Sequence, residues 1–111
     1  MNVVVHGRHL EISEKFRDHV TKKLSKIERF GVEFTSIDVE VSHEANARAA
    51  EREVEVELTT KGGPSVLRAH ASAQDKYVAV DRAYARLEDQ VRKVAERGHH
   101  SHKAHVGRPS A

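Results

Sequence analysis

Two stretches of the chain carry apolar residues at helical spacing. In the first, the apolar positions recur every three or four residues: Phe16, Val20, Leu24 and Ile27. This spacing predicts a helix over about residues 14–30 that packs one face against a core. Ser13 is placed to cap its first turn, and Gly31 is placed to take a left-handed conformation after its last turn.

The second stretch has a longer stripe of the same kind: Tyr77, Val80, Tyr84, Leu87, Val91 and Val94. It predicts a helix over about residues 76–97. Asp75 is the expected N-cap, and Gly98 is expected to end the helix.

Four segments alternate apolar and polar residues as strands do. They lie at residues 2–8, 36–43, 51–60 and about 65–72. In the second and third, most polar positions are acidic, which indicates strands with one buried and one wet face. KGGP at 61–64 is a turn signal, whereas EANARAA at 44–50 has neither Gly nor Pro, so either neighbouring strand could extend into it.

The element order is therefore strand, helix, strand, strand, strand, helix. It predicts an α+β fold: a two-layer sandwich with a four-stranded sheet and both helices on one face. The first strand, helix and strand should form a right-handed parallel crossover, and the later strands should pair as antiparallel hairpins. Residues 1–97 are expected to form one domain, and residues 98–111, which lack periodicity, a flexible linker or tail.

Composition excludes several classes of protein. The 111 residues contain no Cys, which rules out a disulfide scaffold, a thiolate zinc site and a Cys nucleophile. No apolar run approaches a membrane span, and the N-terminus lacks the pattern of a secretory signal, so a cytoplasmic protein is expected.

Charge is distributed unevenly although the formal net charge is only +2. Residues 14–30 hold six basic and three acidic side chains, whereas residues 34–60 hold two basic and seven acidic ones. Away from the apolar stripes, each predicted helix has a basic stripe: Lys15, Lys22, Lys26 and Arg29 on the first, and Arg82, Arg86, Lys93 and Arg97 on the second. Helices on one sheet face would present these stripes side by side, either as a polyanion-binding surface or as an ordinary solvated face.

Other chemistry has little support in the sequence. Most of the five aromatic residues lie on apolar stripes, so recognition of RNA backbone and shape is expected rather than base stacking. There is no Gly-rich phosphate loop and no spacing that pairs a nucleophile with a base, so neither an enzyme nor a cofactor is expected. No physiological metal site is expected from the tail histidines, which are His99, His100, His102 and His105.

Three segments resemble the family of ribosome hibernation promoting factors, which includes ribosome-associated inhibitor A (protein Y): VVVHGRHLEIS, FRDHVTKKLSKIERF and DKYVAVDRAYARLEDQVRKV. The resemblance covers about residues 2–97. Its most specific part is the run from Asp75 to Asp81, followed by the run from Arg86 to Lys93. It implies a fold like the double-stranded RNA-binding domain with an extra first strand.

The resemblance also implies a function. Members bind the small ribosomal subunit, mainly its RNA, in the channel for mRNA and tRNA at the A and P sites. They inhibit translation and preserve idle ribosomes in stress or stationary phase. The positions that match the family's basic residues are Lys23, Lys26, Arg29, Arg86 and Lys93; the helical wheel adds Lys22, Arg82, Arg92 and Arg97.

Two points stay open at this stage. A general double-stranded RNA-binding module is the alternative function, because basic helices fit both. Long members of the family continue through a linker into a C-terminal domain that pairs two ribosomes. The chain stops in what resembles that linker, so it is either a piece of a long member, which the His-rich tail favours, or a short member. Ribosome pairing is expected only through that further domain.

Overall fold

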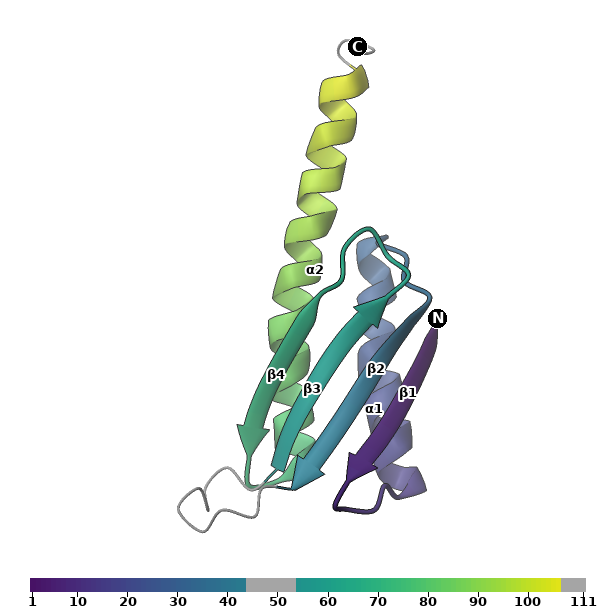
Figure 1. Cartoon of the computed structure of the whole chain (residues 1–111). Coiled ribbons are helices and arrows are strands. Elements are labelled where there is room, and N and C mark those ends of the chain that lie inside the picture. Colours follow the sequence, from purple (N-terminus) through teal and green to yellow (C-terminus); the bar gives the residue numbers. More distant parts are fainter. Residues whose placement is uncertain (44–53, 107–111) are drawn as a thin grey trace.

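The computed structural model confirms the predicted order of elements (Figure 1). It describes residues 1–43 and 54–106, with side chains of the second range as far as Arg97. The elements are β1 (Asn2–Arg8), α1 (Glu14–Ser25), the 3-10 helix η1 (Lys26–Phe30), β2 (Ser36–His43), β3 (Val54–Lys61), β4 (Arg68–Ala73) and α2 (Lys76–Val106). Within the described residues, no helix is both long and apolar enough to cross a bilayer.

The four strands form one mixed sheet in the order β1-β2-β3-β4. β1 pairs with β2 in parallel, and the other two pairings are antiparallel. α1 lies in the crossover between the parallel strands, and both helices cover the same face of the sheet (Figure 1). The predicted α+β sandwich is therefore confirmed, while its likeness to a double-stranded RNA-binding domain stays a prediction.

The core lies between the sheet and the two helices. Alternate residues of the central strands point into it, and the apolar stripes of both helices meet them as predicted. The largest fully buried side chains are Phe16, Leu24, Ile27, Ile37, Leu58, Leu87, Val20, Val39, Val41, Val56, Val80 and Val91. Burial of this apolar surface is the main contribution to the stability of the fold.

Both predicted N-caps are present. The Ser13 hydroxyl accepts a hydrogen bond from the Phe16 amide at 3.1 Å. The Asp75 carboxylate accepts from the Tyr77 amide at 2.7 Å and from the Val78 amide at 3.3 Å. Each cap satisfies amides of the first turn that have no partner within their own helix.

The end of the first helix differs from the prediction of one continuous α-helix. From Lys26 to Phe30 the chain tightens into the 3-10 helix η1, a frequent form of the last helical turn. Gly31 then takes φ 76°, as expected, and its amide donates to the Glu28 carbonyl at 3.1 Å. The spacing of apolar residues does not distinguish these two helix types over a single turn.

The last strand begins later than predicted, at Arg68 instead of residue 65. The Thr60 hydroxyl accepts from the Leu67 amide at 2.8 Å and donates to the Ser65 carbonyl at 3.3 Å, which holds this segment as a turn. Gly62 stands at φ 76°, and a Cβ there would lie 2.0 Å from the Thr35 hydroxyl oxygen. The predicted residues 51–53 of the third strand and the segment 44–50 lie outside the described residues.

The prediction that Gly98 ends the last helix is wrong, because α2 continues through this glycine to Val106. A glycine inside a helix costs about 1 kcal/mol relative to alanine but keeps its backbone hydrogen bonds, so the helix can pass through it. The C-terminal part of α2 projects beyond the end of the sheet (Figure 1). The domain boundary at residue 97 stays a prediction.

Candidate nucleic-acid interface

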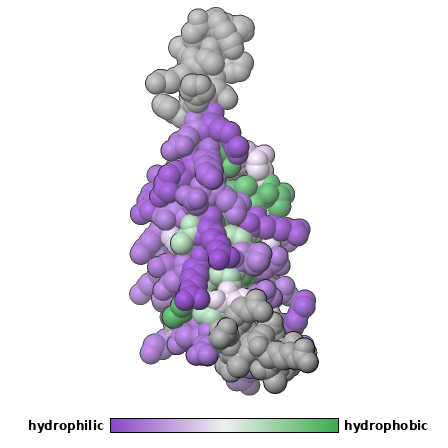
Figure 2. Space-filling view, turned by 90° about the vertical axis from the view of Figure 1, so that its left-hand side faces the viewer, coloured by the Kyte–Doolittle hydropathy of each residue, from purple (hydrophilic) through white to green (hydrophobic). Residues whose placement is uncertain are grey.

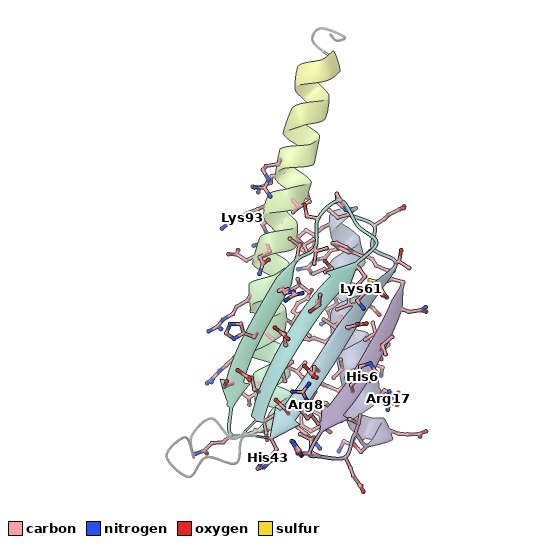
Figure 3. The ribbon with its side chains drawn as sticks, viewed as in Figure 1. His6, Arg8, Arg17, His43, Lys61 and Lys93 are labelled. Carbon is pink, nitrogen blue, oxygen red and sulfur yellow. The ribbon has the colours of Figure 1, made fainter. Side chains whose placement is uncertain are left out.

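The helix layer presents basic residues on two separate flanks. Residues of α2 that face α1 include the acidic Asp81 and Glu88, which form ion pairs with α1 and η1. The basic stripe of α2 lies on its other flank, toward the β4 edge, where Lys93 points away from α1 (Figure 3). The prediction that the two basic stripes lie side by side is therefore wrong, because the acidic residues of α2 occupy the line of contact with α1.

Four of the predicted residues are exposed and lack an ion pair with any described residue: Lys22, Lys26, Lys93 and Arg97. Their charges remain available to an external anion. Two of them lie on the α1 side of the layer and two on the far flank of α2. Together they give the helix layer a cationic character that does not depend on breaking internal contacts.

Lys23 instead connects the two helices. Its Nζ lies 3.5 Å from Asp81 Oδ1 and 5.6 Å from the centroid of the Tyr84 ring. His19 Nε2 lies 3.2 Å from the same carboxylate oxygen. Asp81 therefore gathers two groups from α1 and partly balances the positive charge where the two helices meet.

Arg29 and Arg92 meet at one carboxylate. The Arg29 guanidinium forms a hydrogen-bonded ion pair with Glu88, and Arg92 lies 3.9 Å from the other oxygen of the same group. The two guanidinium carbons lie 4.9 and 5.5 Å from the centroid of the Phe30 ring. Glu88 and Phe30 thus fix the positions of two cations, a role that the sequence analysis missed. The spacing of four residues between Glu88 and Arg92 was the one local signal.

Arg82 and Arg86 are exposed but are tethered to the neighbouring strand. Arg82 donates to the Ser72 carbonyl at 3.0 Å, and Arg86 donates to the His70 carbonyl at 2.5 Å. Both guanidinium groups therefore lie along the free edge of β4. A helical wheel cannot show this, because the partner atoms belong to the backbone of another element.

Acidic side chains gather on the opposite face of the molecule, where no helix covers the sheet. Glu40 and Glu57 are paired across β2 and β3 on this face. Arg8 lies 2.8 Å from Glu40, and Lys61 lies 2.7 Å from Asp38, so part of the negative charge is balanced (Figure 3). In the described strands this face carries four carboxylates, Asp38, Glu40, Glu55 and Glu57, and three cations, Arg8, Lys61 and Arg68, so the predicted acidic side is only weakly acidic.

No group of three His, Asp or Glu side chains within the described part of the chain is arranged to hold a metal ion. The tail histidines, His99, His100, His102 and His105, lie beyond the side chains that the structure describes.

Titration of Tyr84 gives a direct test of the geometry around Glu88. Burial raises the pKa of the Tyr84 phenol above 10.0, and the Glu88 carboxylate, 3.4 Å from its hydroxyl, raises it further, against Arg29 and Arg92, which lower it. In a Tyr77→Phe variant, the absorbance of the one remaining phenolate should therefore show a midpoint above pH 10.0.

Adding Glu88→Gln should lower this midpoint, because the carboxylate that raises the pKa is removed while Arg29 and Arg92, which lower it, remain. Since the folded pKa is the higher one, the free energy of unfolding should fall as pH rises above about 10. A midpoint at or below 10.0 in the first variant would show that Tyr84 is not buried beside Glu88.

The fold and its charges define a small α+β protein with a cationic helix layer and an open sheet face of mixed, weakly acidic charge. The sequence model of the family described as Sigma 54 modulation protein / S30EA ribosomal protein matches residues 3–99. The chain belongs to this family, as the resemblance of its sequence motifs predicts.

Sequence similarity to ribosome hibernation factors supports the same family. The ribosome hibernation promotion factor of Mycobacterium tuberculosis is 37% identical over 105 residues, which are 95% of this chain and 46% of the relative. The ribosome hibernation promoting factor of Pseudomonas putida is 31% identical over 97 residues, which are 87% of this chain and 89% of the relative. The chain thus spans about half the length of the Mycobacterium tuberculosis relative and most of the length of the Pseudomonas putida relative.

A solved structure shares the fold. The crystal structure of the N-terminal domain of Thermus thermophilus Protein Y matches with a TM-score of 0.69 and 32% identity, over 85% of this chain and 99% of that one. A ribosomal subunit interface protein from Coxiella burnetii matches with a TM-score of 0.70 and 25% identity, over 85% of this chain and 97% of that one.

Proposed function

We propose that this chain is a ribosome hibernation factor that binds the small ribosomal subunit through its helix layer. It occupies the channel for mRNA and tRNA at the A and P sites, where it inhibits translation and preserves idle ribosomes. Membership of the family supports the ribosome as the partner. The observation that carries the choice of surface is the set of exposed basic side chains on the helices, opposite a weakly acidic sheet face.

The basic residues contribute in three ways. Those without an ion pair to any residue that the structure describes bind RNA phosphates directly: Lys22, Lys26, Lys93 and Arg97. Those held by carboxylates arrive at the RNA already positioned: Lys23, Arg29 and Arg92. The last two, Arg82 and Arg86, lie at the border of the interface, where each donates to a β4 carbonyl through Nη1 and has further N–H groups for phosphate. Phosphate contacts of this kind position a protein on RNA without reading its sequence.

The proposed mechanism needs no catalytic step and no cofactor. Occupying the channel excludes mRNA and tRNA by volume, and electrostatic attraction to the RNA backbone supplies the affinity. Since its target is the ribosome, the cytoplasm is the proposed location. Pairing of two ribosomes is not assigned to these residues, because in the resemblance it belongs to a further C-terminal domain.

Co-sedimentation with vacant small subunits over a salt series tests the proposal. If the helix layer neutralises about six phosphates, log affinity should fall against log salt with a slope of about −4 to −5. A slope near zero would contradict an interface built on basic side chains.

A competition experiment separates this function from general binding of double-stranded RNA. The affinity of the protein for vacant subunits should exceed its affinity for random duplex RNA by orders of magnitude when the two competitors are compared at equal nucleotide concentration. Equal competition by the duplex would favour the general RNA-binding module instead.

A further inference from the structure

The free edge of β4 is covered by polar side chains from α2. We propose that Arg82, Arg86 and Gln90, here called the edge cap, close this edge against strand pairing with a second copy of the chain. The inference concerns contacts within the chain and does not rest on the proposed function.

The contacts follow one repeating geometry. Residues of the edge cap are spaced by four along α2, and their targets are the carbonyl oxygens of alternate residues along β4. The contacts are Arg82 Nη1 to Ser72 O at 3.0 Å, Arg86 Nη1 to His70 O at 2.5 Å and Gln90 Nε2 to Arg68 O at 2.7 Å.

The spacing of the two elements explains why one register satisfies all three contacts. Four residues of α-helix rise about 6 Å. Two residues of antiparallel strand rise about 6.8 Å. α2 runs antiparallel to β4, because successive residues of the edge cap contact successively earlier residues of the strand. The outward carbonyls of the strand and the long polar side chains of the helix therefore have nearly the same spacing along the contact. Figure 2, which views the side where α2 and β4 lie, shows that hydrophilic residues cover most of it.

Apart from the charge of Arg68 at its start, β4 lacks the common protections of an edge strand. Unpaired backbone groups at a sheet edge invite pairing with another chain, and proteins often block them with Pro, a bulge or charges that point inward. β4 reads RAHASA, with neither Pro nor an inward charge, and its register with β3 is continuous. The opposite edge, on β1, has one long contact of this type, from Arg17 to the Val5 carbonyl at 3.5 Å.

A second copy is the occupant that this strand fits. Antiparallel pairing of two β4 strands centred on His70 would place Arg68 opposite Ser72 of the other copy, so no two arginines would oppose each other. The inward residues, Ala69, Ala71 and Ala73, are small and buried. With the edge cap removed, the two sheets can join as one through backbone hydrogen bonds, as in strand addition.

The experiment replaces the donors with an unbranched apolar side chain. In the variant Arg82→Met, Arg86→Met, Gln90→Met, the apolar stems remain but the contacts to the β4 carbonyls are lost. Sedimentation equilibrium should show dimerisation strengthened by at least about tenfold over the parent chain, or ~1.4 kcal/mol. The matched control, Lys22→Met, Lys26→Met, Lys93→Met, makes as many polar side chains apolar elsewhere on the helices and should stay as monomeric as the parent.

Two more variants locate the contact. His70→Pro, added to the triple variant, removes an outward amide without removing a bond to β3, and should restore the monomer. Arg86→Met alone, at the centre of the edge cap, should shift the equilibrium in the same direction by less. Circular dichroism checks that each variant is folded. A folded triple variant that stays monomeric, association unaffected by His70→Pro, or equal association of the control would overturn the proposal.

Discussion

Reversing the charge of Lys22, Lys26 and Lys93 to Glu should lower affinity for the small subunit by at least about a hundredfold at low salt, or ~2.7 kcal/mol. Each change replaces an attraction to phosphate with a repulsion. All three side chains are exposed and have no internal ion pair in the described structure, so the free energy of unfolding should change by only about 0.5 kcal/mol per site. Co-sedimentation and a thermal melt measure the two quantities separately.

A control with the same change in net charge isolates the role of the helix layer. Arg8, Lys61 and Arg68 point from the open sheet face, and changing them to Glu alters the total charge equally. Two of them lose exposed ion pairs, which are worth about 0–1 kcal/mol each, so the melt of this variant is measured too. Loss of binding in the control with retention in the first variant would show that the sheet, rather than the helices, faces the RNA.

Leu87→Ala should reduce the free energy of unfolding by about 2–5 kcal/mol. Leu87 is 0% exposed, and truncating it loses buried apolar surface and leaves a cavity under α2. Urea denaturation measures the change. On the same helix, Val78 is 41% exposed, so Val78→Ala is the matched control and should cost less than about 0.5 kcal/mol. A loss below about 1 kcal/mol for Leu87→Ala would mean that the apolar stripe does not face the sheet.

The elements could be predicted where local pattern determines them. The stripe through Phe16 and Leu24 and the hydroxyl of Ser13 act within a few residues of chain, so the sequence shows them directly. The ends of elements depend on distant contacts. The Thr60 hydroxyl bonds the Leu67 amide, and β4 starts only after this contact. α2 continues through Gly98 because the free energy of helix formation exceeds the cost of one glycine.

The candidate site was predicted less completely, for the same reason. A helical wheel identifies which residues are basic and turned away from the core, and exposed Lys22 and Lys93 agree with it. It cannot show that Arg29 pairs with Glu88, 59 residues away, or that Arg86 donates to the backbone of β4. Such pairings arise only when separate elements are brought together.

The position of α2 after β3 and β4 in the chain has a consequence for folding during synthesis. β3 and β4 bury their inner residues against α2, whereas α1 packs on β1. While α2 is still in the exit tunnel, half of the inner sheet face has no cover and exposes side chains such as Val56 and Leu58. A nascent chain stalled with Ala73 outside the tunnel and α2 still inside it should therefore be a substrate for chaperones and proteases. It should become protected only when Leu87 and Val91 have left the tunnel.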